Sequence, residues 1–244
     1  LVGQEGADNT ASNAGRSYVI FGKPGNSFAN LAIGDINGSN GFAITSAAAS
    51  GFLGAAVTGG DINGDALTDL IIAQEGLDQA VVIYGVAGQS SYSGINVDSL
   101  ASSAGFRIQR SSLAARVCSS DFDSDGIDDI VVTDSTADSG RGSAWLIFGK
   151  AGTGRGAVDL DSLSASDGFR INGGAFGDAF GTDCAAADNN GDGYTDLLFS
   201  APLADFNGNL DAGRYYVVWG RNFQGKAIPV QTGDQAANAL VGSG

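Results

Sequence analysis

The sequence predicts an all-β protein, a β-propeller of four-stranded blades with about four blades in this chain of 244 residues. Glycine is abundant, with 39 residues against 3 prolines, as expected for short strands joined by tight turns. Apolar strand patterns recur at steps of 63, 64 and 71 residues, and an acidic loop precedes a strand in three of the repeats. Because a β-sandwich does not require a regular internal period, the repeat favours a propeller over that alternative.

Three landmarks define the repeat. An apolar strand that ends in an aromatic residue and glycine occurs four times, at Tyr18-Val19-Ile20-Phe21-Gly22, Val81-Val82-Ile83-Tyr84-Gly85, Trp145-Leu146-Ile147-Phe148-Gly149 and Tyr216-Val217-Val218-Trp219-Gly220. A Gly-Phe-x-Ile strand follows it at Gly41–Ile44, Gly105–Ile108 and Gly168–Ile171, with Leu240 at the equivalent place in the last repeat. The strand before each acidic loop begins at Leu53-Gly54, Leu113-Ala114 or Phe180-Gly181. The repeats therefore run over about 1–45, 46–109, 110–172 and 173–244, and we expect them to form a single domain.

The three acidic loops are candidate calcium sites. Each places oxygen side chains at positions 1, 3, 5 and 9, with the backbone carbonyl of position 7 as a further ligand. Hard oxygen ligands on a tight loop suit Ca²⁺, and a bidentate Glu at position 12, as in an EF-hand, is absent. We expect three ions, held by Asp61, Asn63, Asp65, Leu67 and Asp69, by Asp121, Asp123, Asp125, Ile127 and Asp129, and by Asp188, Asn190, Asp192, Tyr194 and Asp196.

The last repeat resembles a known family. Phe180-Gly181, the 188–196 loop and Ala201-Pro202 occur in the order of the FG-GAP repeats of the integrin α-subunit N-terminal β-propeller. The second and third repeats depart from the pattern, since Leu53-Gly54 and Leu113-Ala114 replace Phe-Gly and Ala73-Gln74 and Thr133-Asp134 replace Ala-Pro. The resemblance implies a propeller with Ca²⁺ in the hairpin between the first two strands of a blade, and a role in adhesion or ligand binding.

The repeat count leaves the ends of such a propeller open. The first residues read as the second strand of a blade, and a seven-bladed propeller would require about seven repeats. We therefore expect the chain to be part of a larger propeller, completed either by self-association or by a missing segment.

The amino-acid composition argues against several classes of function. The formal net charge is −15 with 12 basic residues, which argues against nucleic acid and anionic membranes as partners. The absence of His excludes His-based catalysis and His-ligated zinc, and no apolar run is long enough to span a bilayer. We expect a binding module rather than an enzyme, extracellular or at the cell surface, where calcium is millimolar. The alternatives are the non-catalytic propeller of a secreted lyase or phospholipase, and a lectin-like propeller.

A protein or glycan ligand is expected at the long connection in the last repeat. Pro202–Gly213 is far longer than the equivalent Gln74–Gln79 and carries Asp205, Phe206, Asn207, Asn209 and Asp211. Expanded loops on a regular scaffold are frequent binding sites, although a passive solvated insertion is the equal alternative. The similar Asp35–Ser39 segment lacks an oxygen at position 9 and is predicted to be a turn.

The two cysteines lie on equivalent strands of adjacent repeats. Cys118 and Cys184 precede the first aspartates of their loops by three and four residues, which places them on opposite faces of those strands. The two thiols therefore point either toward each other or directly away. A disulfide forms in the first case, if the Cα atoms lie within about 7 Å, and two separate buried thiols result in the second.

Overall fold

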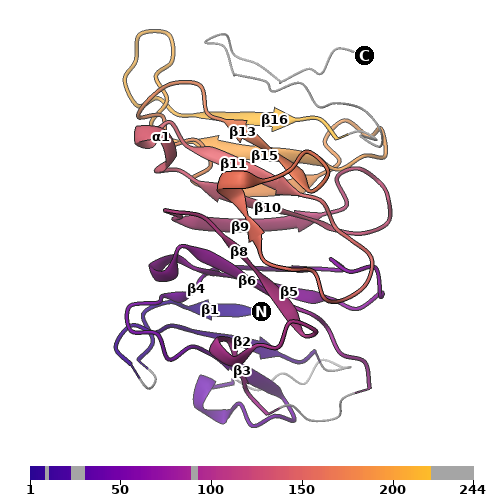
Figure 1. Cartoon of the computed structure of the whole chain (residues 1–244). Coiled ribbons are helices and arrows are strands. Elements are labelled where there is room, and N and C mark those ends of the chain that lie inside the picture. The colour runs from indigo at the N-terminus through magenta and orange to yellow at the C-terminus, as the bar shows by residue number, and fades with distance from the viewer. Residues whose placement is uncertain (9–10, 23–30, 89–92, 221–244) are drawn as a thin grey trace.

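The computed structural model describes residues 1–8, 11–22, 31–88 and 93–220, and these form an all-β structure of four sheets. The predicted all-β fold class is thus confirmed. The sheets are stacked one on another in chain order, from the N-terminal sheet 1 to sheet 4 (Figure 1). Among the described residues, apolar cores lie between sheets 1 and 2, between sheets 2 and 3 and between sheets 3 and 4, but none lies between sheets 4 and 1, so the series of sheets is open.

The strands have the following bounds. Sheet 1 contains β1 (Val2–Gln4), β2 (Arg16–Ile20), β3 (Gly41–Thr45) and β7 (Ile95–Asn96). Sheet 2 contains β4 (Leu53–Gly60), β5 (Asp69–Gln74), β6 (Gln79–Ile83), β8 (Gly105–Gln109) and β12 (Val158–Asp159). Sheet 3 contains β9 (Ala115–Ser120), β10 (Asp129–Asp134), β11 (Ser143–Ile147) and β13 (Gly168–Asn172), and sheet 4 contains β14 (Cys184–Ala187), β15 (Asp196–Ala201) and β16 (Arg214–Val218). Short helical turns lie at Ile33–Asp35, Glu75–Leu77, Val97–Ser99 and Leu160–Ser162, with α1 at Ala137–Gly140.

The predicted order of strands is present in sheets 2 and 3. Consecutive strands pair antiparallel, as in β9–β10–β11–β13, so each repeat forms one meander. The aromatic-Gly strands begin two residues earlier than expected and end before the aromatic residue. In sheets 2, 3 and 4 the glycine that follows contacts the acidic loop. The expected last strand of the fourth repeat, marked by Leu240, lies outside the described residues.

Sheets 1 and 2 each contain one short strand that the sequence did not predict. Two-residue strands from the following repeat, β7 and β12, add in parallel to β3 of sheet 1 and β8 of sheet 2. Each leads into a turn whose aspartate binds the preceding sheet: Asp98 accepts hydrogen bonds from Ser46 and the Ala47 N–H, and Asp161 accepts one from the Ser111 N–H. The signal in the sequence is a recurring Asp-Ser-Leu, at 98–100 and 161–163.

Alternating side chains fill the spaces between the sheets. On β5, Ile71 belongs to the core between sheets 2 and 3, and Ile72 to the core between sheets 1 and 2. On β10, Ile130 likewise faces sheet 2 while Val131 faces sheet 4. Both faces of the middle sheets are therefore buried, as the continuous apolar strands predict.

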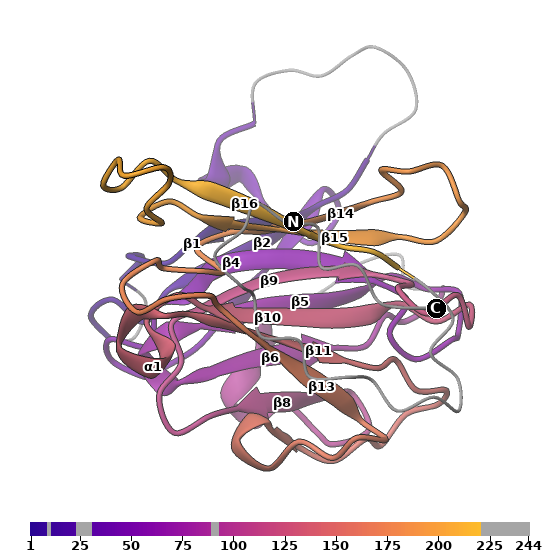
Figure 2. The ribbon, with the colours of Figure 1, turned by 90° about the horizontal axis from the view of Figure 1, so that it is seen from above.

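The first strands of successive sheets lie against one another. β4 packs between β1 and β9, and β9 packs also against β14 (Figure 2). Cys118 on β9 and Cys184 on β14 form a disulfide, with Cα atoms 6.2 Å apart. This resolves the alternative that the sequence left open, because the two cysteines face each other across sheets 3 and 4. None of the described helices is long and apolar enough to cross a membrane.

Candidate metal centre

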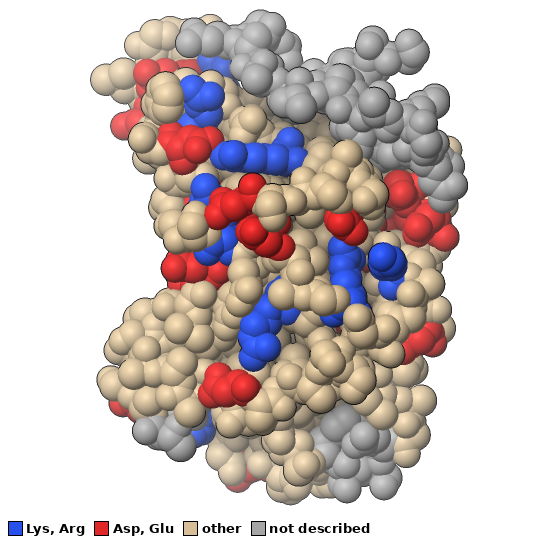
Figure 3. Space-filling view, in the orientation of Figure 1, with Lys and Arg blue, Asp and Glu red and all other residues tan. Residues whose placement is uncertain are grey.

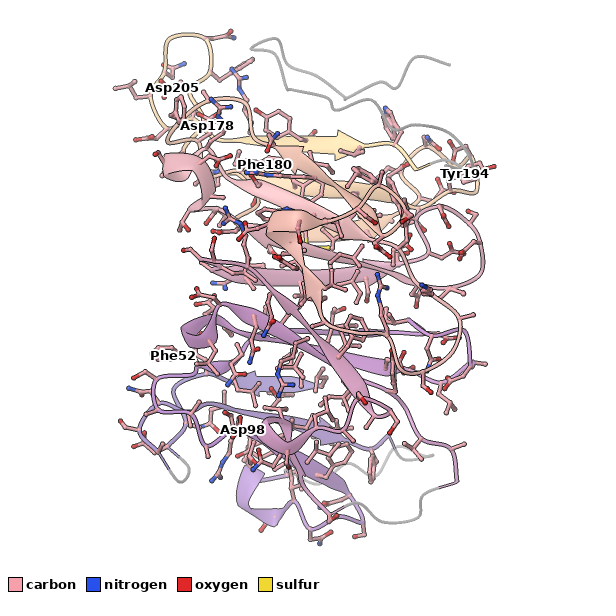
Figure 4. All side chains as sticks on the ribbon, in the orientation of Figure 1. Phe52, Asp98, Asp178, Phe180, Tyr194 and Asp205 are labelled. Atoms are coloured by element: carbon pink, nitrogen blue, oxygen red, sulfur yellow. A yellow bond between two sulfur atoms is a disulfide. The ribbon has the colours of Figure 1, made fainter. Side chains whose placement is uncertain are left out.

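The three acidic loops occupy equivalent places in sheets 2, 3 and 4. They join β4 to β5, β9 to β10 and β14 to β15. Tyr194, in the third loop, and Asp205, in the long connection of the last repeat, lie on opposite sides of the stack of sheets (Figure 4). The candidate metal loops and the candidate ligand loop are thus separated by the length of the strands.

The second loop shows how the acidic side chains are held. The two carboxylate oxygens of Asp121 accept hydrogen bonds from the N–H groups of Asp125 (3.1 Å) and Gly126 (3.0 Å). Asp123 accepts from the Asp125 N–H at 3.1 Å, and Asp125 accepts from the Ile127 N–H at 2.9 Å. The predicted ligands at positions 1, 3 and 5 are therefore turned inward by the backbone of their own loop.

The first and third loops repeat this pattern. The position-3 side chains of Asn63 and Asn190 accept from the N–H groups of Asp65 and Asp192, at 3.0 and 2.8 Å. The position-5 side chains accept from the N–H groups of position 7, both at 2.9 Å. A shared set of hydrogen bonds indicates that the three loops have one conformation.

The last aspartate of each loop binds both its own loop and the glycine of the aromatic-Gly motif. One oxygen of Asp129 accepts the Phe122 N–H within the loop (3.1 Å), and the other accepts the N–H of Gly149 at the end of β11 (2.8 Å). Asp69 binds Gly85 at 2.7 Å and Asp196 binds Gly220 at 2.9 Å in the same way. This contact explains the aromatic-Gly motif, since the glycine must approach the loop closely.

The spacing at these glycines leaves no room for a side chain. A Cβ added at Gly149 would lie 2.6 Å from the backbone oxygen of Asp128, and one at Gly220 would lie 2.0 Å from that of Thr195. Gly22 ends the corresponding strand of sheet 1, where the described residues include no acidic loop, and an added Cβ meets nothing within 4 Å. In sheets 2, 3 and 4 the glycine of the motif therefore marks contact with the acidic loop.

The strongest concentration of carboxylates is in the second loop. Oxygens of Asp121, Asp123 and Asp129 lie within 4.8 Å of one another, and Asp123 and Asp129 are 7% and 1% exposed. Burial, followed by the charge of Asp123, raises the pKa of Asp129 to about 7, and burial followed by the charge of Asp125 raises that of Asp123. Such crowding of buried acids is costly unless a cation neutralises them.

The donor set fits a hard divalent cation. Carboxylate oxygens dominate, and Asn63 and Asn190 supply amide oxygens where the second loop has Asp123. Ca²⁺ accepts such oxygens in flexible geometry, whereas softer metals prefer nitrogen or sulfur. The third loop differs by its exposure, and hydrogen bonds from its own backbone, first that of Gly193, lower the pKa of Asp188.

The predicted ligand loop has an ordered turn of its own. Phe206 and Asn209 form a tight backbone bridge, and Asp205 accepts the Asp211 N–H at 3.0 Å. Arg214 of β16 lies over the Phe206 ring at 5.1 Å. Phe206 is 37% exposed and Asn207 and Asp211 are exposed, so the five predicted residues lie on one surface loop. The other candidate, Asp35–Ser39, is a turn in which Asn37 binds Ser39, as predicted.

Basic and acidic side chains are interspersed on the face shown in Figure 3. Arg110 binds Asp134 at 3.0 Å, and Arg170 binds Asp138 at 2.5 Å. The two guanidinium groups also lie 4.9 and 5.0 Å from the ring centroid of Trp145. Each of these two arginines is therefore held by an acid and by the Trp145 ring, and Arg110, which follows β8 of sheet 2, links that sheet to β10 of sheet 3.

Sequence reasoning missed contacts made by residues between the predicted ligands. Asp128, at position 8 of the second loop, accepts the Asp61 N–H of the first loop at 2.8 Å. The equivalent residues are Thr68 and Thr195, so only a comparison of position 8 among the repeats could have singled it out. Neither a protein-family model nor a curated protein matches the chain.

Proposed function

We propose that this protein is a calcium-binding β-propeller module of the FG-GAP type, which holds one Ca²⁺ in each of its three acidic loops. The observation that carries the proposal is the conformation common to the loops, with inward-turned oxygens at positions 1, 3 and 5 and a buried aspartate at position 9. In this proposal Ca²⁺ neutralises the acidic side chains and fixes the hairpin that links the first two strands of each blade.

The stacking of the sheets supports the propeller architecture. Each of sheets 2 and 3 is a meander, and the first strands of adjacent sheets lie side by side, as the inner strands of neighbouring blades do. The disulfide between β9 and β14 supports an oxidising, extracellular location, where millimolar calcium would load loops of modest affinity.

Adhesion or ligand binding is the role that we propose for the module. Phe206 and its polar neighbours Asp205, Asn207, Asn209 and Asp211 would contact a protein or glycan at the end of the molecule opposite the calcium loops. The open edge at β1, where Val2 is 44% exposed, would be covered by a second copy or by another propeller segment. Sedimentation velocity tests the first alternative: association of the chain would support a second copy at this edge, and a monomer at all concentrations would contradict it.

Thermal unfolding with and without a chelator tests calcium binding. A ligand that binds the native state stabilises it by mass action, so excess EDTA should lower Tm by several degrees. Mg²⁺ added in place of Ca²⁺ should restore little of the loss, because Mg²⁺ demands stricter geometry and dehydrates reluctantly. Identical melting curves in EDTA and in millimolar Ca²⁺ would refute the proposal.

A further inference from the structure

The first and second acidic loops are joined directly, across the interface between sheets 2 and 3. The Asp61 N–H donates to a carboxylate oxygen of Asp128 at 2.8 Å, and the Asp128 N–H donates to the Asp61 carbonyl at 2.8 Å. Asp61 is the first predicted ligand of one loop, and Asp128 immediately precedes the last predicted ligand of the other. One reciprocal pair of hydrogen bonds thus connects two candidate metal centres.

A second connection runs through the segment that follows β11. Gly149 donates to the Asp129 carboxylate, and the next residue, Lys150, donates its N–H to the Ile62 carbonyl at 3.1 Å. The Gly152 N–H then donates to the carbonyl of Asn63 at 2.8 Å. Residues 149–152 therefore contact both loops: they bind the Asp129 side chain of the second loop and the backbone at Asn63 of the first loop.

Close packing makes these contacts stiff. A Cβ added at Gly60 would lie 2.5 Å from the Asp128 carboxylate, and one at Gly64 would lie 3.2 Å from the Ile127 side chain. Because neither loop has free space beside the other, a change in the conformation of one loop must move the other.

The third loop lacks such a connection in the described part of the chain. Its position 8 is Thr195, whose hydroxyl lies 3.1 Å from that of Ser120 on β9. Ser120 precedes the second loop, so this contact involves none of the predicted ligands of that loop. Asp188, Asn190 and Asp192 are also exposed, whereas Asn63 and Asp123 are 2% and 7% exposed.

From this asymmetry we propose that Asp128 couples the first two calcium sites, so that Ca²⁺ in one raises the affinity of the other, while the third site binds independently. The inference rests on the proposed calcium function. The ordering that the first ion imposes on Asp61 or Asp129 is transmitted through Asp128, and the second ion finds its loop already positioned. Both loops keep a net negative formal charge after taking one Ca²⁺, because they supply three and four ligand aspartates. A loaded loop therefore still attracts the ion of its neighbour, although less strongly than an empty loop does.

Calorimetric Ca²⁺ titration of the full chain tests the coupling. In a protein with the third loop disabled by Asp188→Asn and Asp192→Asn, we expect two ions to bind with positive cooperativity, the second about tenfold more tightly than independent sites allow, within the range of typical coupling. Adding Asp128→Ala to that protein should reduce the gain in affinity of the second ion to less than about twofold. Asp128→Asn keeps an oxygen acceptor for the Asp61 N–H and should retain most of the gain.

A matched protein provides the control. With the first loop disabled by Asp61→Asn and Asp65→Asn, the second and third loops should bind independently, with or without Thr195→Ala. Hydrogen exchange of the Asp61 amide, measured in EDTA, reports the Asp128 contact without calcium and should be faster in Asp128→Ala.

The possible results separate the two proposals. The coupling would be overturned if the protein that retains the first two loops bound two ions without cooperativity, or if cooperativity persisted in Asp128→Ala. Either result would leave the proposal of calcium binding intact. Absence of Ca²⁺ binding in the unmodified chain would overturn both.

Discussion

A single methyl group at Gly149 should test the contact between strand end and acidic loop. In the Gly149→Ala protein the new Cβ would lie 2.6 Å from the Asp128 carbonyl oxygen and 2.6 Å from the Ile127 side chain, so the backbone must shift. Overpacking of this kind costs about 1–3 kcal/mol. The shift also weakens the 2.8 Å hydrogen bond from the Gly149 N–H to the Asp129 carboxyl group, and such a hydrogen bond contributes about 0.5–1.5 kcal/mol.

The free energy of unfolding should therefore fall by about 3 kcal/mol, which for a domain of this size lowers Tm by about 6–12 °C. Differential scanning calorimetry in EDTA measures the effect without a contribution from bound metal. Gly22→Ala is the matched control, since it changes the same motif where the added Cβ meets none of the described residues within 4 Å, and its Tm should stay within about 2 °C of the parent. Equal Tm values for the two variants would refute the explanation of the aromatic-Gly motif.

Three further predictions follow from the same contacts. Replacing both Cys118 and Cys184 by Ser should lower the free energy of unfolding by about 4 kcal/mol, as expected for a disulfide between residues separated by 66 positions. Unfolding by denaturant measures this loss, and an unchanged free energy of unfolding would contradict the prediction. Asp161→Asn should cost no more than about 0.5 kcal/mol near neutral pH, because the Asp161 side chain is 42% exposed and solvent screens its interactions. Ser111 first, and then Arg110, lower the pKa of Asp161 below its ordinary value of 3.8. The stability difference from the parent should therefore disappear as pH falls below that value, and a difference that persists at pH 2 would contradict this expectation. Deleting 203–211 and joining the ends with Gly-Ser should leave calcium binding and Tm nearly intact while abolishing ligand binding, and retention of an identified ligand by the deletion protein would refute the placement of that site.

The repeat made much of the fold predictable. Strand positions such as Asp69–Ala73 followed from short apolar runs, and the inward-turned Asp121 and Asp125 followed from their spacing on a glycine-containing turn. The glycine of the aromatic-Gly motif was recognised as a landmark but not explained, because its reason is a contact with an aspartate about 20 residues away.

Features that depend on neighbouring sheets could not be predicted in the same way. β7 and β12 are two residues long and pair with a preceding sheet, so no local period reveals them. The disulfide required knowing which faces of β9 and β14 meet, and the role of Asp128 required knowing that the first loop lies beside the second. In each case the determining contact joins two repeats.

Counting the bound ions tests the central proposal most directly. Equilibrium dialysis at millimolar Ca²⁺, with protein and metal both quantified, should give three ions per chain for the parent and two for a protein with Asp121→Asn and Asp125→Asn. Circular dichroism should show that the substituted protein retains its strands, so that the missing ion reflects the lost ligands. A parent chain that binds no Ca²⁺ at millimolar concentration, or a substituted chain that still binds three ions, would contradict the account.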